Sequence, residues 1–309
     1  MVGEFDKTSG EENKPFIRDS RDKVKNGKKE EKETPKDTTK FFSSEQADET
    51  KKGLDVLFFG DANSGKTYIA HTFPEPIFII DTERRANKTK QYHFPGKDVR
   101  PFRPMEISTK IKTLGSIEDT VDFEGSVDNL TNVLIEFHNK VASGEIKQGT
   151  LVVDSMSDVW WWVQEWGKIR LAKKEKIDLV TFRLKQQFDW GMMNDRHYKL
   201  IVVMRKLLDY GINLVATARE KRCPEYVATP LAVSMSDRIR AQKDVPFWFS
   251  TIINLQVRRV QSQTADNKRY MSVIEKLETF DYKGDIIENL TYQKLKALID
   301  KKREEVAKK

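Results

Sequence analysis

The 309-residue sequence has little cysteine, little histidine and no long apolar run, and each absence excludes a class of protein. Its one cysteine, Cys223, cannot form a disulfide within the chain, which favours a reducing compartment. The four histidines lie far apart, without the spacing of a metal site. No apolar stretch approaches the roughly 18–20 residues of a membrane span, and the N-terminus lacks the apolar segment of a signal peptide. We therefore expect a soluble cytoplasmic protein with no membrane partner.

Charged residues are abundant by contrast, and their distribution is uneven. The chain has 55 Lys and Arg against 48 Asp and Glu, a formal net charge of +7. Residues 1–52 carry 13 of each sign and few apolar side chains, so we expect a disordered charged tail. This tail either keeps the protein soluble or tethers it to a partner or to nucleic acid. The surplus of seven positive charges belongs to residues 53–309, with 42 basic and 35 acidic side chains.

From Gly53 onward, short apolar runs rich in β-branched residues predict strands. The five runs are residues 55–59, 76–80, 150–153, 212–217 and 251–257. Long or helical segments separate the first four, which is typical of a parallel sheet covered on both faces. We therefore predict an α/β core.

Other segments fill in this core and define its end. Residues 127–142 and 189–209 have the apolar spacing of crossover helices, and residues 268–277 alternate like a late strand that pairs with the fifth. The segment from Thr291 to the end has Leu295, Leu298 and Ile299 on one side of a helix. The predicted division is a tail over 1–52, a core over 53–282 and a basic amphipathic C-terminal helix over 283–309.

One segment matches the phosphate-loop pattern G-x-x-x-x-G-K-[ST], and it lies between an expected strand and an expected helix. Glycines in this pattern let backbone N–H groups point at phosphate oxygens, and the helix N-terminus adds a positive end. Lys66 is expected to reach the β- and γ-phosphates, and the Thr67 hydroxyl to ligate Mg²⁺. The expected phosphate-binding residues are Gly60, Asp61, Ala62, Asn63, Ser64, Gly65, Lys66 and Thr67.

Two acidic side chains stand at the ends of expected strands. Asp154 follows the run 150–153, where a carboxylate can hold Mg²⁺, usually through water. Glu83 follows the strand after the phosphate-loop helix. Hydrolysis needs a carboxylate aimed at a water beside the γ-phosphate, and Glu83 is the candidate.

Residues 60–85, GDANSGKTYIAHTFPEPIFIIDTERR, resemble RecA-like ATPases, especially the phage- and plasmid-encoded nucleotide-binding proteins. The turn Phe73-Pro74-Glu75-Pro76 and the strand end Asp81-Thr82-Glu83 match that group, as does the run 151–155, and the likeness covers roughly residues 53–280. It implies a RecA-like P-loop fold, with a mainly parallel central sheet flanked by helices and antiparallel edge strands late in the chain. It also implies ATP and Mg²⁺ as cofactors, Glu83 as catalytic base, and a homo-oligomer with nucleotide at the subunit interface.

Two positions depart from the pattern of these relatives. The sensor position after the fourth strand is commonly His or Gln, and here it is Arg219. Arg219 contacts the γ-phosphate, points to DNA, or is an ordinary surface arginine. Relatives often carry a Lys-x-Arg pair on a late strand that reaches the neighbouring subunit's nucleotide, whereas this chain has Lys276 alone.

The resemblance also implies two regions that contact nucleic acid. The first, residues 166–206, holds 11 basic and 4 acidic side chains, and the second, residues 219–243, holds six basic and three acidic ones. Neutralising phosphates with such side chains gives salt-sensitive binding, although basic runs also occur on ordinary solvated helices. The candidate DNA-binding residues are Lys168, Arg170, Lys173, Lys174, Lys176, Lys221, Arg222, Arg238 and Arg240.

Four tryptophans follow Asp154 closely, at positions 160, 161, 162 and 166. Trp160 and Trp166 share helical spacing with Val163, so they fit a core. Three consecutive tryptophans cannot all face one core, and at least one must be exposed or in a subunit contact. Core packing with an oligomer interface and stacking on unpaired bases both remain open.

Three functions fit these features. The first is a Mg²⁺-dependent ATPase that acts on single-stranded DNA in recombination, annealing or replication, in a virus, plasmid or prokaryote as the resemblance implies. The second is a nucleotide-switched loader or adaptor that binds a replication protein. The third is a DNA-translocating motor. Fold alone does not separate them.

Overall fold

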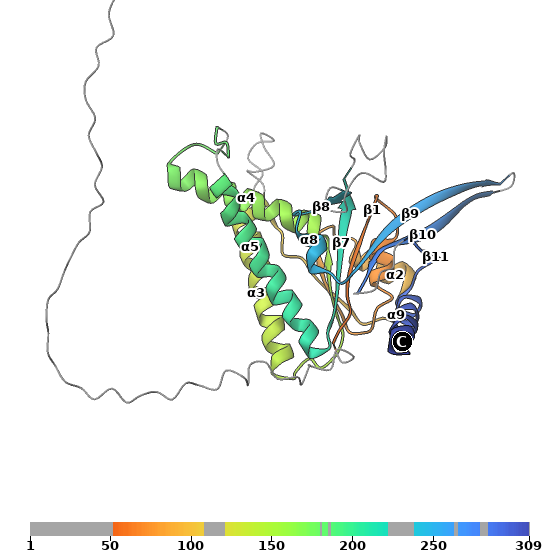
Figure 1. The fold of residues 1–309 in the computed structure, drawn as a ribbon. Coiled ribbons are helices and arrows are strands. Elements are labelled where there is room, and N and C mark those ends of the chain that lie inside the picture. The colour runs from red at the N-terminus through yellow and green to blue at the C-terminus, as the bar shows by residue number, and fades with distance from the viewer. Residues whose placement is uncertain are drawn as a thin grey trace, which may run out of the picture. The chain divides into compact units, whose positions relative to one another are not determined.

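The computed structural model describes residues 52–107, 121–179, 181–184, 187–221, 238–262, 265–278 and 284–308 (Figure 1). In these residues the main sheet consists of β1 (Asp55–Gly60), β2 (Ile77–Asp81), β3 (Val99–Phe102), β6 (Thr150–Asp154), β7 (Asn213–Glu220), β8 (Ile239–Arg240), β9 (Thr251–Ser262), β10 (Ala265–Leu277) and β11 (Ile286–Glu288). β4 (Glu106–Ile107) and β5 (Val121–Asp122) pair separately. The helices are α1 (Lys66–Ala70), α2 (Ala86–His93), α3 (Phe123–Ala142), α4 (Met156–Glu175), α5 (Gln187–Lys206), α8 (Val245–Trp248) and α9 (Tyr292–Ala307), with the 3-10 helix η4 (Leu207–Tyr210).

The strand order of the main sheet is β11-β10-β9-β1-β7-β6-β2-β3, and β8 pairs with β7. The pairings from β3 through β2, β6, β7 and β1 to β9 are parallel, whereas β10, β11 and β8 pair antiparallel. Because β7 lies between β1 and β6, the carboxyl ends of these three strands meet at one edge. The predicted α/β class, with a mainly parallel sheet and late antiparallel strands, is confirmed.

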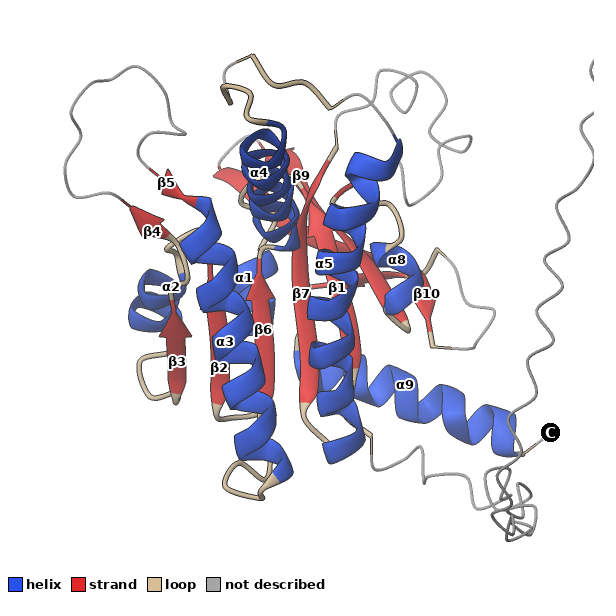
Figure 2. Ribbon diagram, turned by 90° about the vertical axis from the view of Figure 1, so that its left-hand side faces the viewer, coloured by secondary structure: helices blue, strands red, loops and turns tan. Residues whose placement is uncertain are grey.

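Helices cover both faces of the sheet, and strand alternation supplies each face with its core. In β1, Leu57 and Phe59 pack into a cluster with α3, α4 and α5, whereas Val56 and Phe58 pack into a second cluster with α1 and α9. Figure 2 shows α3, α4 and α5 side by side in front of the sheet. Since neighbouring residues of a strand point to opposite faces, an apolar run buried on both sides requires this two-layer cover.

The five predicted strands are β1, β2, β6, β7 and β9, with small differences at their ends. The late strand is β10, and it pairs with β9 as expected. The two predicted crossover helices are α3 and α5. The sequence did not indicate β3, because its four residues include Pro101; this proline is tolerated since β3 lies at the sheet edge.

The segment after Thr291 forms α9 as its periodicity predicts, but the start of the range predicted as a C-terminal helix, 283–309, contains strand β11, which pairs with β10. Thr291 caps this helix by accepting a hydrogen bond from the Lys294 backbone N–H, and Leu295 and Ile299 are fully buried in the cluster that contains Val56. The predicted tail over residues 1–52 lies outside the described residues except for Lys52, and it stays a prediction. Among the described residues, no helix combines the length and the apolar character needed to cross a membrane.

Candidate functional site

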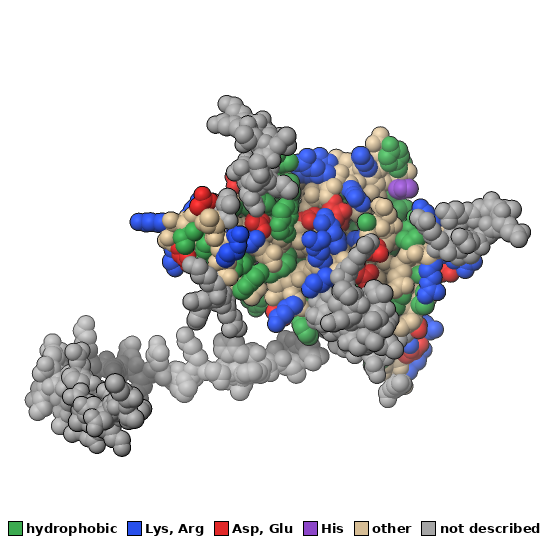
Figure 3. Space-filling view, turned by 90° about the horizontal axis from the view of Figure 1, so that it is seen from above, with side chains coloured by type: hydrophobic (Ala, Val, Ile, Leu, Met, Phe, Trp, Pro, Cys, Tyr) green, Lys and Arg blue, Asp and Glu red, His purple; other side chains and the backbone are tan. Residues whose placement is uncertain are grey.

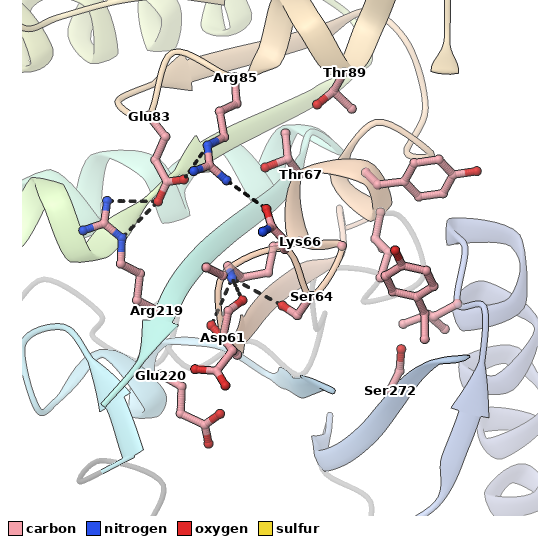
Figure 4. A pocket seen from close by; sticks show the side chains of 18 of the residues that line it. Asp61, Ser64, Lys66, Thr67, Glu83, Arg85, Thr89, Arg219, Glu220 and Ser272 are labelled. Atoms are coloured by element: carbon pink, nitrogen blue, oxygen red, sulfur yellow. Dashed lines mark hydrogen bonds and ion pairs between the residues drawn. The ribbon is translucent and has the colours of Figure 1, made fainter. Parts of the chain in front are cut away.

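The phosphate loop joins the end of β1 to the start of α1. Gly65 has φ 94°, a left-handed conformation that favours glycine, and it precedes the first helical residue, Lys66. The Lys66 ammonium is folded back on the loop, donating to the carbonyl oxygens of Gly60 at 3.0 Å and Asp61 at 2.7 Å (Figure 4). Burial lowers the pKa of Lys66, and nearby Glu83, among other carboxylates, opposes this shift. The lysine therefore stands at the place where phosphate oxygens would replace these carbonyl partners.

Asp154 is fully buried at the end of β6, beside the start of α1. Its carboxylate accepts hydrogen bonds from the Thr67 hydroxyl, at 2.7 Å, and from the Thr217 hydroxyl of the adjacent strand β7. Burial raises the pKa of Asp154, and these two hydrogen bonds oppose the shift. A buried carboxylate next to a hydroxyl is a pair of hard oxygen ligands that suits Mg²⁺.

Glu83 follows β2 and faces Arg219 at the end of β7 (Figure 4). The Arg219 guanidinium donates to Glu83 Oε1 at 3.1 Å and to Asp158 at 3.0 Å. Arg85 approaches the other Glu83 oxygen at 3.6 Å. The Glu83 carboxylate is therefore held between two guanidinium groups, next to the phosphate loop.

These side chains line a cavity of about 1030 Å³, which we call the nucleotide cavity. One end contains the phosphate loop, Glu83 and Arg219. The remaining lining includes Tyr68 and His93 from the α1–α2 side and, from β10 and the segment before α9, Tyr270, Met271, Ser272, Asn289, Leu290 and Thr291. The sequence did not indicate the lining residues from β10 and from the segment before α9, because they carry no local motif. They reach the cavity only through the pairing of β9, β10 and β11.

Of the candidate DNA-binding residues on α4, three engage acidic neighbours. Lys168 pairs with Glu165 at 2.6 Å, and both Arg170 and Lys173 pair with Glu124 on α3. Arg170 and Lys173 therefore help to hold α4 against α3, whereas the Lys168 pair lies within α4. Lys174 and Lys176 are exposed at the carboxyl end of α4.

The candidate DNA-binding residues of the second region, 219–243, also include both a paired and buried side chain and exposed ones. Arg238 is buried, with a guanidinium that lies 2.8 Å from Glu275 and 3.7 Å from Glu220. Lys221 and Arg240 are exposed at the ends of β7 and β8. Arg222 lies outside the described residues. Figure 3 shows Lys and Arg side chains gathered beside Asp and Glu near the centre of the face where the parallel strands end.

Two further expectations concern single residues. Lys276 donates to the backbone carbonyl of Phe249 at 2.6 Å, within its own chain, and burial lowers its pKa. Among the tryptophans, Trp162 and Trp166 are buried, whereas Trp161 is 38% exposed. The expectation that at least one of the consecutive tryptophans is exposed is confirmed.

Comparison with protein families identifies the chain. A model described as an AAA domain matches residues 52–283, most of the sequence. The chain belongs to the AAA domain family. This AAA domain is a P-loop ATPase, and the predicted enzyme class is confirmed.

Similar proteins of known structure include a KaiC-like protein from the hyperthermophilic archaeon Pyrococcus horikoshii. It is 16% identical to this AAA domain, the match covers 77% of this chain and 85% of that chain, and the TM-score is 0.39. Comparison with curated proteins gives no match.

Proposed function

We propose that this AAA domain is a Mg²⁺-dependent ATPase that acts on single-stranded DNA in recombination, annealing or replication. The observation that carries the proposal is the position of Arg219. Its side chain holds Glu83 at the phosphate end of the nucleotide cavity, and the strand that bears it leads into the basic segment 219–243. One arginine thus adjoins both the proposed hydrolysis site and two exposed cations, Lys221 and Arg240.

In the proposed mechanism, backbone N–H groups of the phosphate loop bind the β- and γ-phosphates, and Lys66 exchanges its carbonyl partners for phosphate oxygens. Thr67 and Asp154 hold Mg²⁺, which neutralises phosphate charge when it is bound. The Glu83 carboxylate accepts a proton from the attacking water. Arg219 releases Glu83 as its guanidinium turns to the γ-phosphate, because phosphate oxygens offer it an equally suitable bidentate partner.

The experiment that tests this function is a comparison of ATP hydrolysis rates with Mg²⁺ and with excess chelator, each without nucleic acid and with single-stranded DNA, double-stranded DNA or RNA. We expect hydrolysis to require Mg²⁺ and single-stranded DNA to stimulate it most. Lys66→Ala is the control that removes phosphate binding. Equal rates in all nucleic-acid conditions would contradict the role on single-stranded DNA.

The alternatives predict other results in the same assay. Slow hydrolysis that no nucleic acid changes, together with nucleotide-dependent binding of a protein, would favour a loader or adaptor. Stimulation by double-stranded DNA with directional movement along it would favour a motor. The expected homo-oligomer is tested by light scattering of the purified chain with and without ATP.

A further inference from the structure

A second cavity, of about 710 Å³, adjoins the nucleotide cavity. The two share Glu83, Arg85, Arg219 and Arg240 in their linings, so these side chains form their common boundary. The rest of the second cavity is lined by the first turns of α4, by the end of β2 and by the β7–β8 pair. Its size falls within the range of small-molecule sites, which is roughly 300–1,000 Å³.

An aromatic wall bounds the second cavity on the α4 side. Trp161 is 38% exposed and lines the cavity together with Trp160 and Gln164. The Trp161 ring meets Phe123 edge to face, with ring centroids 5.2 Å apart and an interplanar angle of 76°. This contact fixes the indole, and Gln164 lies one helical turn later on the same side of α4. The wall therefore offers a fixed aromatic ring with a hydrogen-bonding amide beside it.

The β7–β8 lining of the second cavity carries cations. In the antiparallel β7–β8 pair, Arg219 stands directly opposite Arg240. Arg219 is balanced by Glu83 and Asp158. Arg240 and Lys221 are exposed, and neither forms an ion pair within the described part of the chain. Because Glu83 and Asp158 neutralise Arg219, Arg240 and Lys221 are the side chains of the β7–β8 pair that are available to hold an anion in this cavity.

We propose that the second cavity binds an unpaired nucleotide of single-stranded nucleic acid, with the base stacked on Trp161 and the phosphate held by Lys221 and Arg240. A flat aromatic group joined to an anion fits both walls at once, whereas an acidic peptide would leave the indole unused. The inference rests on the proposed function and names its binding site.

The shared boundary gives this site a direct effect on hydrolysis. A strand phosphate held by Lys221 and Arg240 would lie beside Arg219, because Arg219 stands opposite Arg240. Its charge would loosen Arg219 from Glu83 before the guanidinium turns to the γ-phosphate. Weakening the Arg219–Glu83 pair frees the carboxylate to accept a proton from water. Bound nucleic acid therefore affects the proposed base, Glu83, through a single side chain, Arg219.

The test is the affinity of the full chain for a fluorescent oligothymidine, measured by anisotropy with ATP and Mg²⁺ at several salt concentrations. Trp161→Ala should weaken binding roughly 5- to 150-fold, which corresponds to the loss of one stacked base. Trp161→Phe should keep most of the affinity. Arg240→Ala should lower the slope of log affinity against log salt by about 0.7. Thermal unfolding of each variant shows whether it is folded.

The matched control is Tyr210→Ala. Tyr210 is an exposed aromatic residue like Trp161, with 45% of its surface accessible, but it lies on η4 and lines neither cavity, so oligothymidine binding should not change. Unchanged binding by folded Trp161→Ala and Arg240→Ala, with binding by the wild type, would overturn the cavity assignment and leave the proposed function standing. No binding by the wild type would overturn both. Displacement of the oligonucleotide by polyglutamate as readily as by unlabelled oligothymidine would show recognition of charge alone and overturn base stacking.

Discussion

Replacing Glu83 by Gln separates the chemistry of the site from its stability. Glutamine keeps an oxygen that can accept from Arg219, now at 3.1 Å, but it cannot take a proton from water. Loss of a general base lowers turnover by roughly 10²- to 10⁴-fold. We therefore expect phosphate release at saturating ATP and Mg²⁺ to fall by that factor.

The same substitution should leave the fold intact. The Arg219 side chain is 42% exposed, so its ion pair with Glu83 is screened by solvent and contributes about 0–1 kcal/mol. Asp158, which lies 3.0 Å from Arg219, is not altered by the substitution and should still hold the guanidinium. The free energy of unfolding in urea should change by less than about 1 kcal/mol. ATP affinity should stay the same or increase, because a negative charge beside the phosphates is removed.

Glu124→Gln is the matched control. Glu124 pairs with two basic side chains, Arg170 and Lys173, yet lines neither cavity, so turnover should be unchanged. Undiminished turnover by Glu83→Gln would refute the assignment of Glu83 as base. A fall in turnover that matched a loss of folded protein would show a structural role in its place.

Three further predictions concern stability. Thr217→Val removes a hydrogen bond to the buried Asp154 carboxylate and should lower the free energy of unfolding by about 1–3 kcal/mol in urea titrations, whereas Thr217→Ser should restore it. Gly149→Ala should lower the melting temperature, because Gly149 has φ 135° and an added Cβ would lie 2.5 Å from a backbone carbonyl oxygen; Gly96→Ala, where no atom lies within 4 Å of the added Cβ, should not. Burial lowers the pKa of His197 from 6.5 to about 4, so between these pH values the unfolded state binds the extra proton. Above pH 6.5, His197 is neutral in both states and does not lower the free energy of unfolding. As the pH falls from 6.5 to 4, protonation of the unfolded state lowers that free energy by roughly 3 kcal/mol. His197→Gln should flatten this part of the stability–pH curve, and an equally steep curve would contradict the assignment.

The sequence predicted those parts of the site that depend on local order along the chain. A strand, a glycine-containing loop and a helix in succession place Lys66 and Thr67 whatever the rest of the fold does. Apolar runs of β-branched residues likewise predicted the central strands, because burial on both faces demands them.

Charge counts along the chain were less informative about individual side chains. Arg170 and Arg238 were equal candidates for DNA contacts, but Arg238 is buried between carboxylates and Arg170 pairs with α3. A basic side chain contributes to a surface only where no acidic neighbour neutralises it, and that neighbour comes from another element. Lys221 and Arg240 keep their exposure because they stand at strand ends.

By itself, then, the sequence determined the α/β class, the phosphate loop and the carboxylates at the ends of β2 and β6, since each depends on residues close together in the chain. Tertiary structure alone decided which arginines hold Glu83, which tryptophan is exposed and that a second cavity adjoins the first. The second cavity takes its walls from residues 82–85, Met105, residues 157–164, Arg219, Lys221 and residues 239–241, which only the sheet order brings to one edge. Spacing along a chain fixes what lies on one strand or one helical face, whereas contacts between elements depend on how the layers pack.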